Sequence, residues 1–286
     1  MVPAGARAGN MAAMDSQQLT ARTADGGTLA ISIHGSGPPL LLIPGLGATR
    51  VVFDPMLEPL VSRGRRVIVF DPRGTGESAP GRDPLNMALL AADATAVLDT
   101  AGVDAADVLG ASMGGVVAQH LVLDHASRVG SLVLAATAPG GSRAVPADPR
   151  ASDALLGKGA RTPEDAYRLA CTVLYSPQFQ RTHVDFIEAQ VRQRAARPVR
   201  ATVFTAQLAA LRADGSSFDR LAGVRTPTLI THGTADAVTP IENARLLATR
   251  IPAVRTRWFD GCGHLFFHER PDESARVVDE FLRAPS

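Results

Sequence analysis

Three residues that lie far apart in the sequence could together carry out nucleophilic catalysis: Ser112, Asp236 and His264. Ser112 is the central residue of a Gly-x-Ser-x-Gly pattern within the apolar stretch DVLGASMGGVVAQH, residues 107–120. A serine hydroxyl attacks a carbonyl carbon only when a base takes its proton, and a histidine oriented by a carboxylate supplies that base. These residue types therefore predict acyl-transfer chemistry wherever the fold brings them together.

The glycines at 110 and 114 indicate that Ser112 occupies a sharp turn from a strand into a helix. In such a turn the residues two before and two after the serine approach closely, and a side chain at Gly110 or Gly114 would clash. The turn also lifts the hydroxyl above the carboxyl ends of the strands and aims the following helix N-terminus at a developing anion. The alternative is an ordinary tight turn in which Ser112 only caps the helix.

Asp236 and His264 lie in loops that follow the last two expected strands. Asp236 stands in THGTADAVTP, residues 231–240, and His264 in FDGCGHLFFHERP, residues 259–271. Both loops fall at the same end of a parallel sheet as the serine turn, in the chain order serine, aspartate, histidine. Asp260 competes as the orienting acid, but it sits at the end of a strand, so we prefer Asp236.

Cys262, His264 and His268 have a spacing that superficially suggests a metal site. Zinc has four protein ligands in structural sites, or three and a water in catalytic ones, commonly with further supporting partners. The sequence therefore predicts neither a metal ion nor an organic cofactor.

Alternating strand and helix patterns predict an α/β fold with a doubly wound, mostly parallel sheet. A hairpin is expected over 18–23 and 28–34, followed by strands at 39–44, 65–70, 107–111, 131–137, 227–233 and 255–260. Helices are expected at 84–100, 113–125, 240–250 and 272–283. Thr239 and Glu242 form a capping-box signature for the third of these helices.

The alternation of strand and helix patterns stops between residues 139 and 225, where helical patterns such as 163–175 and 198–213 dominate. We expect this segment to be a helical cap that selects the substrate, inserted into a core made of 18–138 and 226–286. The glycines at 140 and 141 could act as its hinge. The first 17 residues are small and polar, which favours a flexible tail.

Composition excludes several classes of function. The chain of 286 residues has 29 basic and 28 acidic residues, so its net charge of +1 offers no electrostatic footprint for nucleic acid. No apolar run approaches the ~18 residues of a membrane-spanning helix, so no membrane partner is expected. The two cysteines, Cys171 and Cys262, are too few for a disulfide framework, which favours a cytoplasmic protein.

Across about residues 28–286 the chain resembles serine hydrolases of the α/β-hydrolase fold. The segment LLIPGLGATRVVFDPMLEPL, residues 41–60, resembles the family's oxyanion loop and following helix, and FDPRGTGES, residues 70–78, resembles its Asp-x-Arg-Gly-x-Gly-x-Ser segment. GTADAVTP and GCGHLFFHERP resemble its acid and histidine loops. Within the family the chain is most similar to 3-oxoadipate enol-lactonases and aclacinomycin methylesterase-like enzymes. It departs at Pro44, where many members have a histidine.

The resemblance implies cleavage of a small-molecule ester or lactone through an acyl-enzyme on Ser112. It places the backbone N–H groups of Leu46 and Met113 in the oxyanion hole. Aromatic residues of the cap would contribute apolar pocket surface; the candidates are Tyr167, Tyr175, Phe179 and Phe186. An arginine of the cap could hold a substrate carboxylate.

The same triad also serves perhydrolase or haloperoxidase-like chemistry and the hydrolysis of C–C bonds, so the fold leaves these alternatives open. C–C hydrolases that resemble this chain have an aromatic residue directly after the histidine, where this chain has Leu265. A third alternative, from another class, is a ligand-binding protein that keeps the scaffold without turnover.

Overall fold

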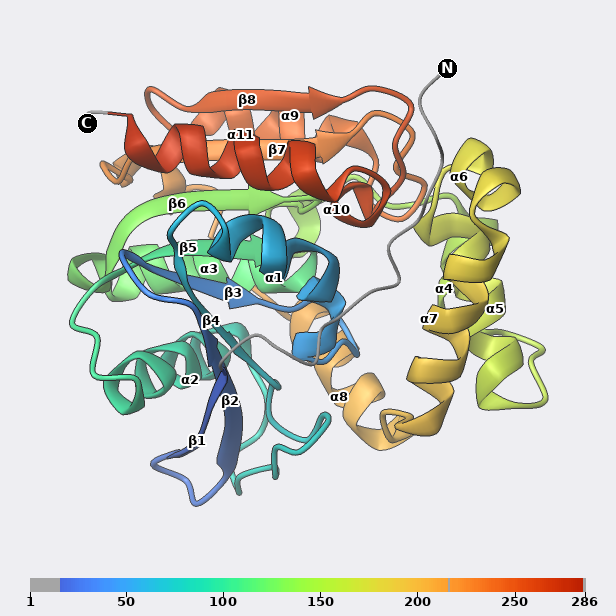
Figure 1. The fold of residues 1–286 in the computed structure, drawn as a ribbon, viewed down its shortest axis with the longest axis horizontal. Helices are drawn as coiled ribbons and strands as arrows, with labels where there is room; N and C mark the ends of the chain where they lie inside the picture. Colours follow the sequence, from blue (N-terminus) through green and yellow to red (C-terminus); the bar gives the residue numbers. More distant parts are fainter. Residues whose placement is uncertain (1–15, 216, 285–286) are drawn as a thin grey trace.

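The computed structural model describes residues 16–215 and 217–284. In this part of the chain a single eight-stranded sheet runs through the centre of the molecule (Figure 1). Its strands are β1 (Ser16–Arg22), β2 (Thr28–His34), β3 (Pro39–Ile43), β4 (Arg66–Phe70), β5 (Ala106–Ala111), β6 (Val129–Ala135), β7 (Thr228–Gly233) and β8 (Arg255–Phe259).

The order of the strands across the sheet is β1-β2-β4-β3-β5-β6-β7-β8. β1 and β2 form the expected antiparallel hairpin, with Leu19 opposite Ile31, and β2 is also antiparallel to β4. All other neighbouring strands are parallel. The prediction of a mostly parallel, doubly wound sheet is therefore confirmed, and the carboxyl ends of β5, β7 and β8 lie along one edge.

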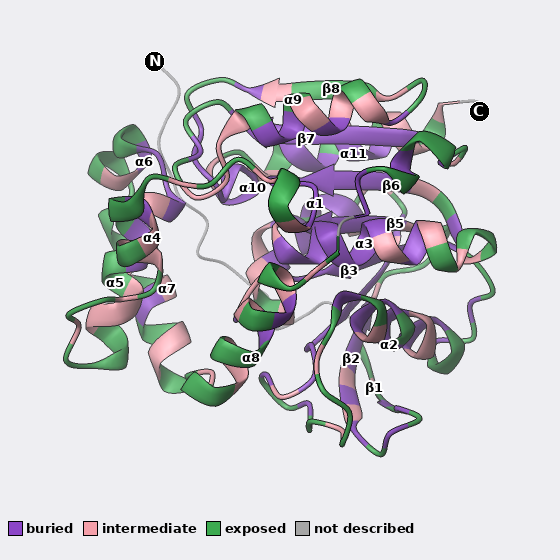
Figure 2. Ribbon diagram, turned by 180° about the vertical axis from the view of Figure 1, so that it is seen from behind, coloured by how far each residue is buried: buried purple, intermediate pink, exposed green. Residues whose placement is uncertain are grey.

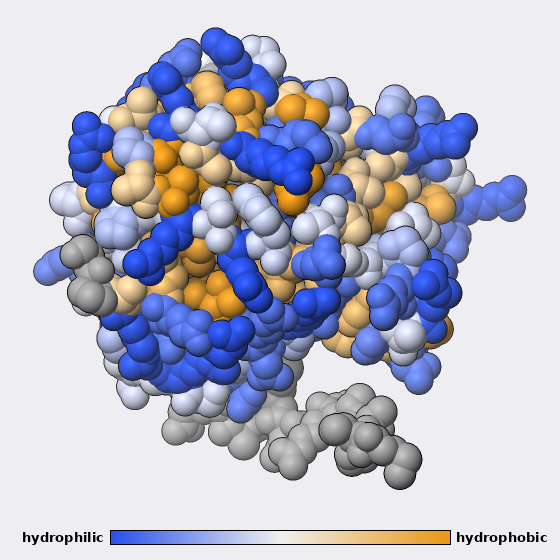
Figure 3. All heavy atoms as spheres, turned by 90° about the horizontal axis from the view of Figure 1, so that it is seen from above, coloured by the Kyte–Doolittle hydropathy of each residue, from blue (hydrophilic) through white to orange (hydrophobic). Residues whose placement is uncertain are grey.

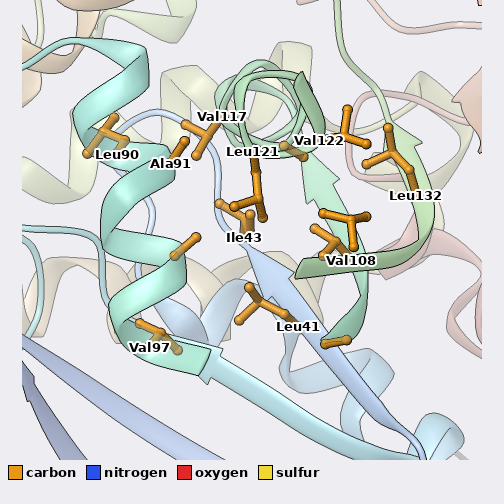
Figure 4. Packing of buried hydrophobic residues seen from close by; sticks show 14 of the residues in the cluster. Leu41, Ile43, Leu90, Ala91, Val97, Val108, Val117, Leu121, Val122 and Leu132 are labelled. Carbon is orange, nitrogen blue, oxygen red and sulfur yellow. The ribbon is translucent and has the colours of Figure 1, made fainter. Parts of the chain in front are cut away.

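Two hydrophobic cores sandwich the sheet, because successive residues of a strand point to opposite faces. Leu41 of β3 packs in one core with α2 (Met87–Thr100), α3 (Met113–Asp124) and α9 (Ile241–Arg250). Its neighbour Leu42 packs in the other core with α1 (Asp54–Val61), α10 (Phe266–Glu269) and α11 (Pro271–Arg283). Figure 4 shows the first core, where Leu90 of α2 and Leu121 of α3 belong to the same cluster as the strand residues Leu41 and Val108. Burial on both faces explains why the central strands are continuous apolar runs.

The helices that cover the sheet come from segments between successive strands and from the segment after β8. The helices of the core are α1 (Asp54–Val61), α2 (Met87–Thr100), α3 (Met113–Asp124), α9 (Ile241–Arg250), α10 (Phe266–Glu269) and α11 (Pro271–Arg283). In Figure 1, α1 and α11 lie on the near face of the sheet.

Five further helices occupy the interval between β6 and β7. They are α4 (Pro149–Leu155), α5 (Pro163–Leu174), α6 (Pro177–Thr182), α7 (Val184–Ala196) and α8 (Ala201–Arg212). Helices α4 to α7 lie beyond the carboxyl ends of β6 and β8, which the arrowheads mark (Figure 1). Figure 2 shows that their outward faces are exposed while the central strands are buried.

The starts of β1 and of α2 differ from expectation. Ser16 and Gln17 belong to β1, and the rest of the expected tail, residues 1–15, lies outside the described residues. Helix α2 begins at Met87 instead of Pro84, because the Asn86 side chain caps it by accepting from Leu89 N–H.

The capping box expected at Thr239 is wrong. The N-cap of α9 is Pro240, and no side chain caps that end. Thr239 is engaged elsewhere, since its N–H donates to Asp236 Oδ1 and its carbonyl accepts from His232 Nε2.

The surface carries a mixture of hydrophilic and hydrophobic residues on the face seen in Figure 3. Within residues 16–215 and 217–284, no helix has the length and apolar character needed to cross a membrane.

Candidate active site

Ser112 sits between the end of β5 and the start of α3, in a backbone conformation that non-glycine residues rarely adopt. Its φ is +55° and its ψ is −122°. The strained turn is held by two hydrogen bonds: Ser112 N–H donates to Ala135 O at 2.9 Å, and Thr137 Oγ1 donates to Ser112 O at 2.6 Å. Such strain persists only where the surroundings enforce it, and it is concentrated at functional sites.

The glycines around Ser112 are required by close backbone contacts. A Cβ on Gly110 would lie 2.2 Å from the carbonyl oxygen of Gly114. A Cβ on Gly114 would lie 2.1 Å from the carbonyl oxygen of Ile43 in β3. The clash expected from the sequence at these two positions is therefore present, and α3 packs directly against the strand ends.

The acid and histidine loops bring Asp236 and His264 together, although 28 residues separate them in the chain. His264 Nδ1 lies 2.7 Å from Asp236 Oδ2. The other carboxylate oxygen, Oδ1, accepts hydrogen bonds from Val238 N–H and Thr239 N–H, each at 2.8 Å. The carboxylate is thereby fixed in orientation. Asp260 is turned away and accepts from Thr234 Oγ1.

The Asp236 carboxylate is buried but remains ionised. Burial favours the neutral acid, yet the neighbouring His264 and His232 outweigh it, so the pKa of Asp236 is lowered well below its usual range. His232, on β7, is itself fully buried, and its Nε2 lies 3.2 Å from Asp236 Oδ2. The signal for His232 was weak, because this residue stands four residues before Asp236 in a strand that otherwise has the pattern of a core strand.

Ser112 and His264 line the same cavity, which has a volume of about 140 Å³. Its walls are mainly apolar and include Leu46, Val52, Leu155, Leu174, Phe204 and Leu265. A cavity of this kind, with a few placed polar groups, is the form that small-molecule sites take.

The backbone around Leu46 approaches the serine closely. A Cβ on Gly45 would lie 3.0 Å from Ser112 Cβ and 3.5 Å from its Oγ. We call residues 45–48 the oxyanion loop, after the role that the resemblance predicts for Leu46. Met113, next to Ser112 in the chain, is the first residue of α3, and the first N–H groups of a helix have no partner within the helix.

Gln207 of α8 anchors the oxyanion loop, a role that the sequence analysis missed. Its Oε1 accepts from Gly47 N–H at 2.8 Å, and both residues are buried. Phe204, one turn earlier on α8, packs against the same glycine. A signal was present in the sequence, because Gln207 interrupts an otherwise apolar stripe of that helix.

Arg194 of α7 also lines the cavity, and its guanidinium lies 5.8 Å from the centre of the Tyr167 ring. Within the described part of the chain, Arg194 forms no ion pair. Burial lowers the pKa of this guanidinium, but an arginine stays charged in proteins. Gln190 and Gln193 line the cavity from the same helix, so α7 supplies its polar side.

Of the four cap aromatics proposed for the pocket, Tyr167 lines it and the other three do not. Tyr175, Phe179 and Phe186 pack on one another, with ring centroids 5.4–6.3 Å apart. The reason is that α5 ends at Leu174, and Tyr175 then turns into the core, where its hydroxyl meets His268 Nδ1 at 2.9 Å. This cluster joins the inserted helices to α10.

His268 is bonded at both ring nitrogens, since Nε2 also donates to Val52 O at 2.7 Å. Burial lowers the pKa of His268 to about 4, so the ring is neutral near pH 7. Cys171 and Cys262 are free and buried. In residues 16–215 and 217–284 no group of three or more potential ligands is arranged to hold a metal ion.

The sequence and fold match those of known hydrolases. Residues 38–271 match the model of the family described as "alpha/beta hydrolase fold". A protein of Azorhizobium caulinodans named "Putative carbamate hydrolase RutD" is 34% identical over 89% of this chain and 93% of its own length. A 2-hydroxy-6-oxononadienedioate/2-hydroxy-6-oxononatrienedioate hydrolase of Cupriavidus pinatubonensis is 30% identical over 91% of this chain and 88% of its own. The solved structure of a thermophilic esterase from Thermogutta terrifontis superposes with a TM-score of 0.77 at 28% identity, over 93% of this chain and 98% of that one.

Proposed function

We propose that this chain, which belongs to the alpha/beta hydrolase fold family and is a hydrolase, cleaves small carboxylic esters or lactones through an acyl-enzyme on Ser112. The observation that supports the proposal best is the His264 ring, which is fixed on the buried Asp236 carboxylate and lines the cavity that contains Ser112. A strained serine, a base and an orienting acid are the parts that acyl transfer needs.

In the first half of the reaction, Ser112 Oγ attacks the carbonyl carbon while its proton passes to His264 Nε2. Asp236 accepts the Nδ1–H bond and stabilises the imidazolium that forms. The C–O bond then breaks, and His264 gives the proton to the leaving oxygen. For a lactone, the leaving oxygen stays attached to the acyl group through the opened ring.

The oxyanion would be bound by the backbone N–H groups of Leu46 and Met113. The close approach of the oxyanion loop to Ser112 and the N-terminus of α3 support this role. In the second half, water attacks the acyl carbon, its proton passes to His264, and the proton returns to Ser112 Oγ as the acid is released.

Arg194 favours a substrate that carries a carboxylate near the scissile bond. It is a cation without an ion-pair partner among the described residues, and it lies on the wall of a mainly apolar cavity. A guanidinium binds a carboxylate through two parallel hydrogen bonds. The relative named for a dienedioate, a dicarboxylate, is consistent with this preference.

A fluorophosphonate probe tests the nucleophile. We expect one adduct, on Ser112, and Ser112→Ala should abolish labelling and lower kcat for p-nitrophenyl acetate by about 10⁴-fold or more. Ser62→Ala, which replaces a serine at the end of α1, is the matched control and should label and turn over as the wild type does. Full esterase activity in Ser112→Ala, or an adduct on another residue, would exclude the mechanism.

Cleavage of a C–C bond is the second candidate, because the relative from Cupriavidus is named for a ring-opened dienedioate. Leu265 occupies the position after the histidine where an aromatic residue would favour this reaction. Parallel kcat/KM measurements on an aryl ester, a lactone, a carbamate and a vinylogous diketo acid separate these reactions. We expect the ester or the lactone to give the highest value, and a higher value for the diketo acid would replace the proposal.

A further inference from the structure

The catalytic cavity is too small to enclose a substrate of more than a few carbon atoms beyond the scissile bond. Its volume of about 140 Å³ is close to that of a protein cavity that holds one benzene ring, about 150 Å³. Binding sites for drug-sized ligands are at least about twice as large. Any longer part of a substrate must therefore leave the cavity on one side.

A groove of about 500 Å³ adjoins the cavity between α4, α5 and α8. The groove and the cavity share a wall, which consists of Leu155, Tyr167, Ala170, Arg194 and Phe204. Because these residues line both spaces, the groove lies directly beyond this wall of the cavity, and a chain that passes between their side chains enters the groove.

The lining of the groove is predominantly apolar. Beyond the shared wall it includes Leu156, Ala166, Val199, Ala201 and Leu208. Leu156 is 42% exposed, which is unusual for so large an apolar side chain and indicates that the groove opens to solvent. Gly157, which is also part of the lining, lies so close to α5 that a Cβ there would be 2.7 Å from Ala166 Cβ.

We propose that this groove binds the hydrocarbon chain of the substrate and makes the enzyme selective for medium-chain esters or lactones. The inference rests on the proposed function for the reacting end of the substrate, which occupies the cavity beside Ser112. The lining residues that the two spaces share and the apolar surface of the groove point to an alkyl chain as the occupant. Arg194 lies at the junction, so the polar end of the substrate stays on the cavity side.

Chain length is the variable that tests the groove. Burying one methylene is worth about 0.8 kcal/mol, which corresponds to roughly a fourfold gain in kcat/KM. We expect kcat/KM to rise by about this factor per methylene from four to about eight carbons, either in p-nitrophenyl esters of growing acyl chain or in acetates of growing alkyl alcohol. A flat profile in both series would overturn the proposal.

Two variants on adjacent residues of α8 separate the groove from general effects on the fold. Thr205 lines the groove and is exposed, whereas its exposed neighbour Ala206 is not part of the lining. Thr205→Trp should fill the groove and lower kcat/KM for the octanoate ester at least about tenfold while leaving the acetate ester unchanged. Ala206→Trp should change neither. Equal effects of Thr205→Trp on both esters would also overturn the proposal.

Direct binding distinguishes a failure of the groove from a failure of the catalytic proposal. In calorimetric titrations of Ser112→Ala with butanoate and decanoate, decanoate should bind more tightly, and Thr205→Trp in the same background should remove the difference. If esters are not hydrolysed but this difference is found, the groove stands and the proposed function fails. If esters are hydrolysed and the difference is absent, the groove proposal fails alone.

Discussion

Replacing Gln207 with leucine isolates the contact by which α8 holds the oxyanion loop. Leucine leaves the buried Gly47 N–H without its acceptor, which costs about 1–3 kcal/mol. However, Gln207 Nε2 is buried without a hydrogen-bond partner among the described residues. Removing the amide therefore also removes the cost of burying this unpaired donor. Because the two effects offset each other, we expect the free energy of unfolding to change by less than about 2 kcal/mol.

Turnover should respond more strongly than stability. Gly47 follows Leu46, whose N–H is the proposed oxyanion donor, so a loop without its anchor holds that donor less accurately. Complete loss of one oxyanion donor lowers kcat by about 10²–10³-fold. For a loosened donor we expect a fall of about tenfold or more, equivalent to at least about 1.4 kcal/mol of transition-state stabilisation. KM should change little, because the walls of the cavity remain.

The assay combines kcat and KM for p-nitrophenyl acetate with urea unfolding. Gln119→Leu is the matched control: Gln119 of α3 is also buried, and its amide bonds Ala138 O at 2.9 Å and Ser217 Oγ at 2.7 Å, not the oxyanion loop. This control should lose stability and keep its kcat. A folded Gln207→Leu enzyme with wild-type kcat would refute the coupling between α8 and the oxyanion loop.

Four further predictions concern the triad, the turn, the buried histidine and the cavity arginine. Asp236→Asn should lower kcat for p-nitrophenyl acetate by about 10⁴-fold, because the amide favours the wrong tautomer of the histidine, and a loss under tenfold would contradict this. Gly114→Ala should fail to fold or melt far below the wild type, since its Cβ would lie 2.1 Å from a backbone oxygen; an unchanged Tm would count against the packing described. The pKa of His268 is about 4 in the folded protein, whereas histidine in the unfolded chain titrates at ~6.5, so the unfolded state takes up the proton first as the pH falls. In urea unfolding, the free energy of unfolding of the wild type should therefore fall between about pH 7.5 and pH 5 by about 2 kcal/mol more than that of His268→Gln. Parallel pH profiles of the two proteins would disprove this. Arg194→Met should lower kcat/KM for a carboxylate-bearing ester by about 10–100-fold relative to a neutral ester. The control Arg192→Met, at an exposed position on the same helix, should not. Equal losses in both variants would contradict the proposed preference for a carboxylate.

The sequence determined those features that depend on local geometry and on the order of the elements. Apolar runs such as residues 39–44 are typical of strands buried on both faces, and the structure places β3 (Pro39–Ile43) in the interior of the sheet. The glycines at 110 and 114 indicate a turn so tight that it leaves no room for a Cβ at either position. For Gly110 this requirement involves only residues close in the chain, so the sequence shows it directly. Strand order and chain direction then place the loops of Asp236 and His264 at one edge of the sheet.

Only the tertiary structure decided which side chains of the inserted helices face the reaction. An aromatic residue on an amphipathic helix lowers its free energy equally well against the core or in a pocket, so the sequence could not separate Tyr167 from Tyr175. The hydrogen bond that Tyr175 finds on His268, 93 residues away, settles its direction. For the same reason Gln207 was missed, and the arginine expected in the cap could not be assigned to Arg194. Their places beside Gly47 and on the cavity wall arise from chain packing, which local sequence patterns do not encode.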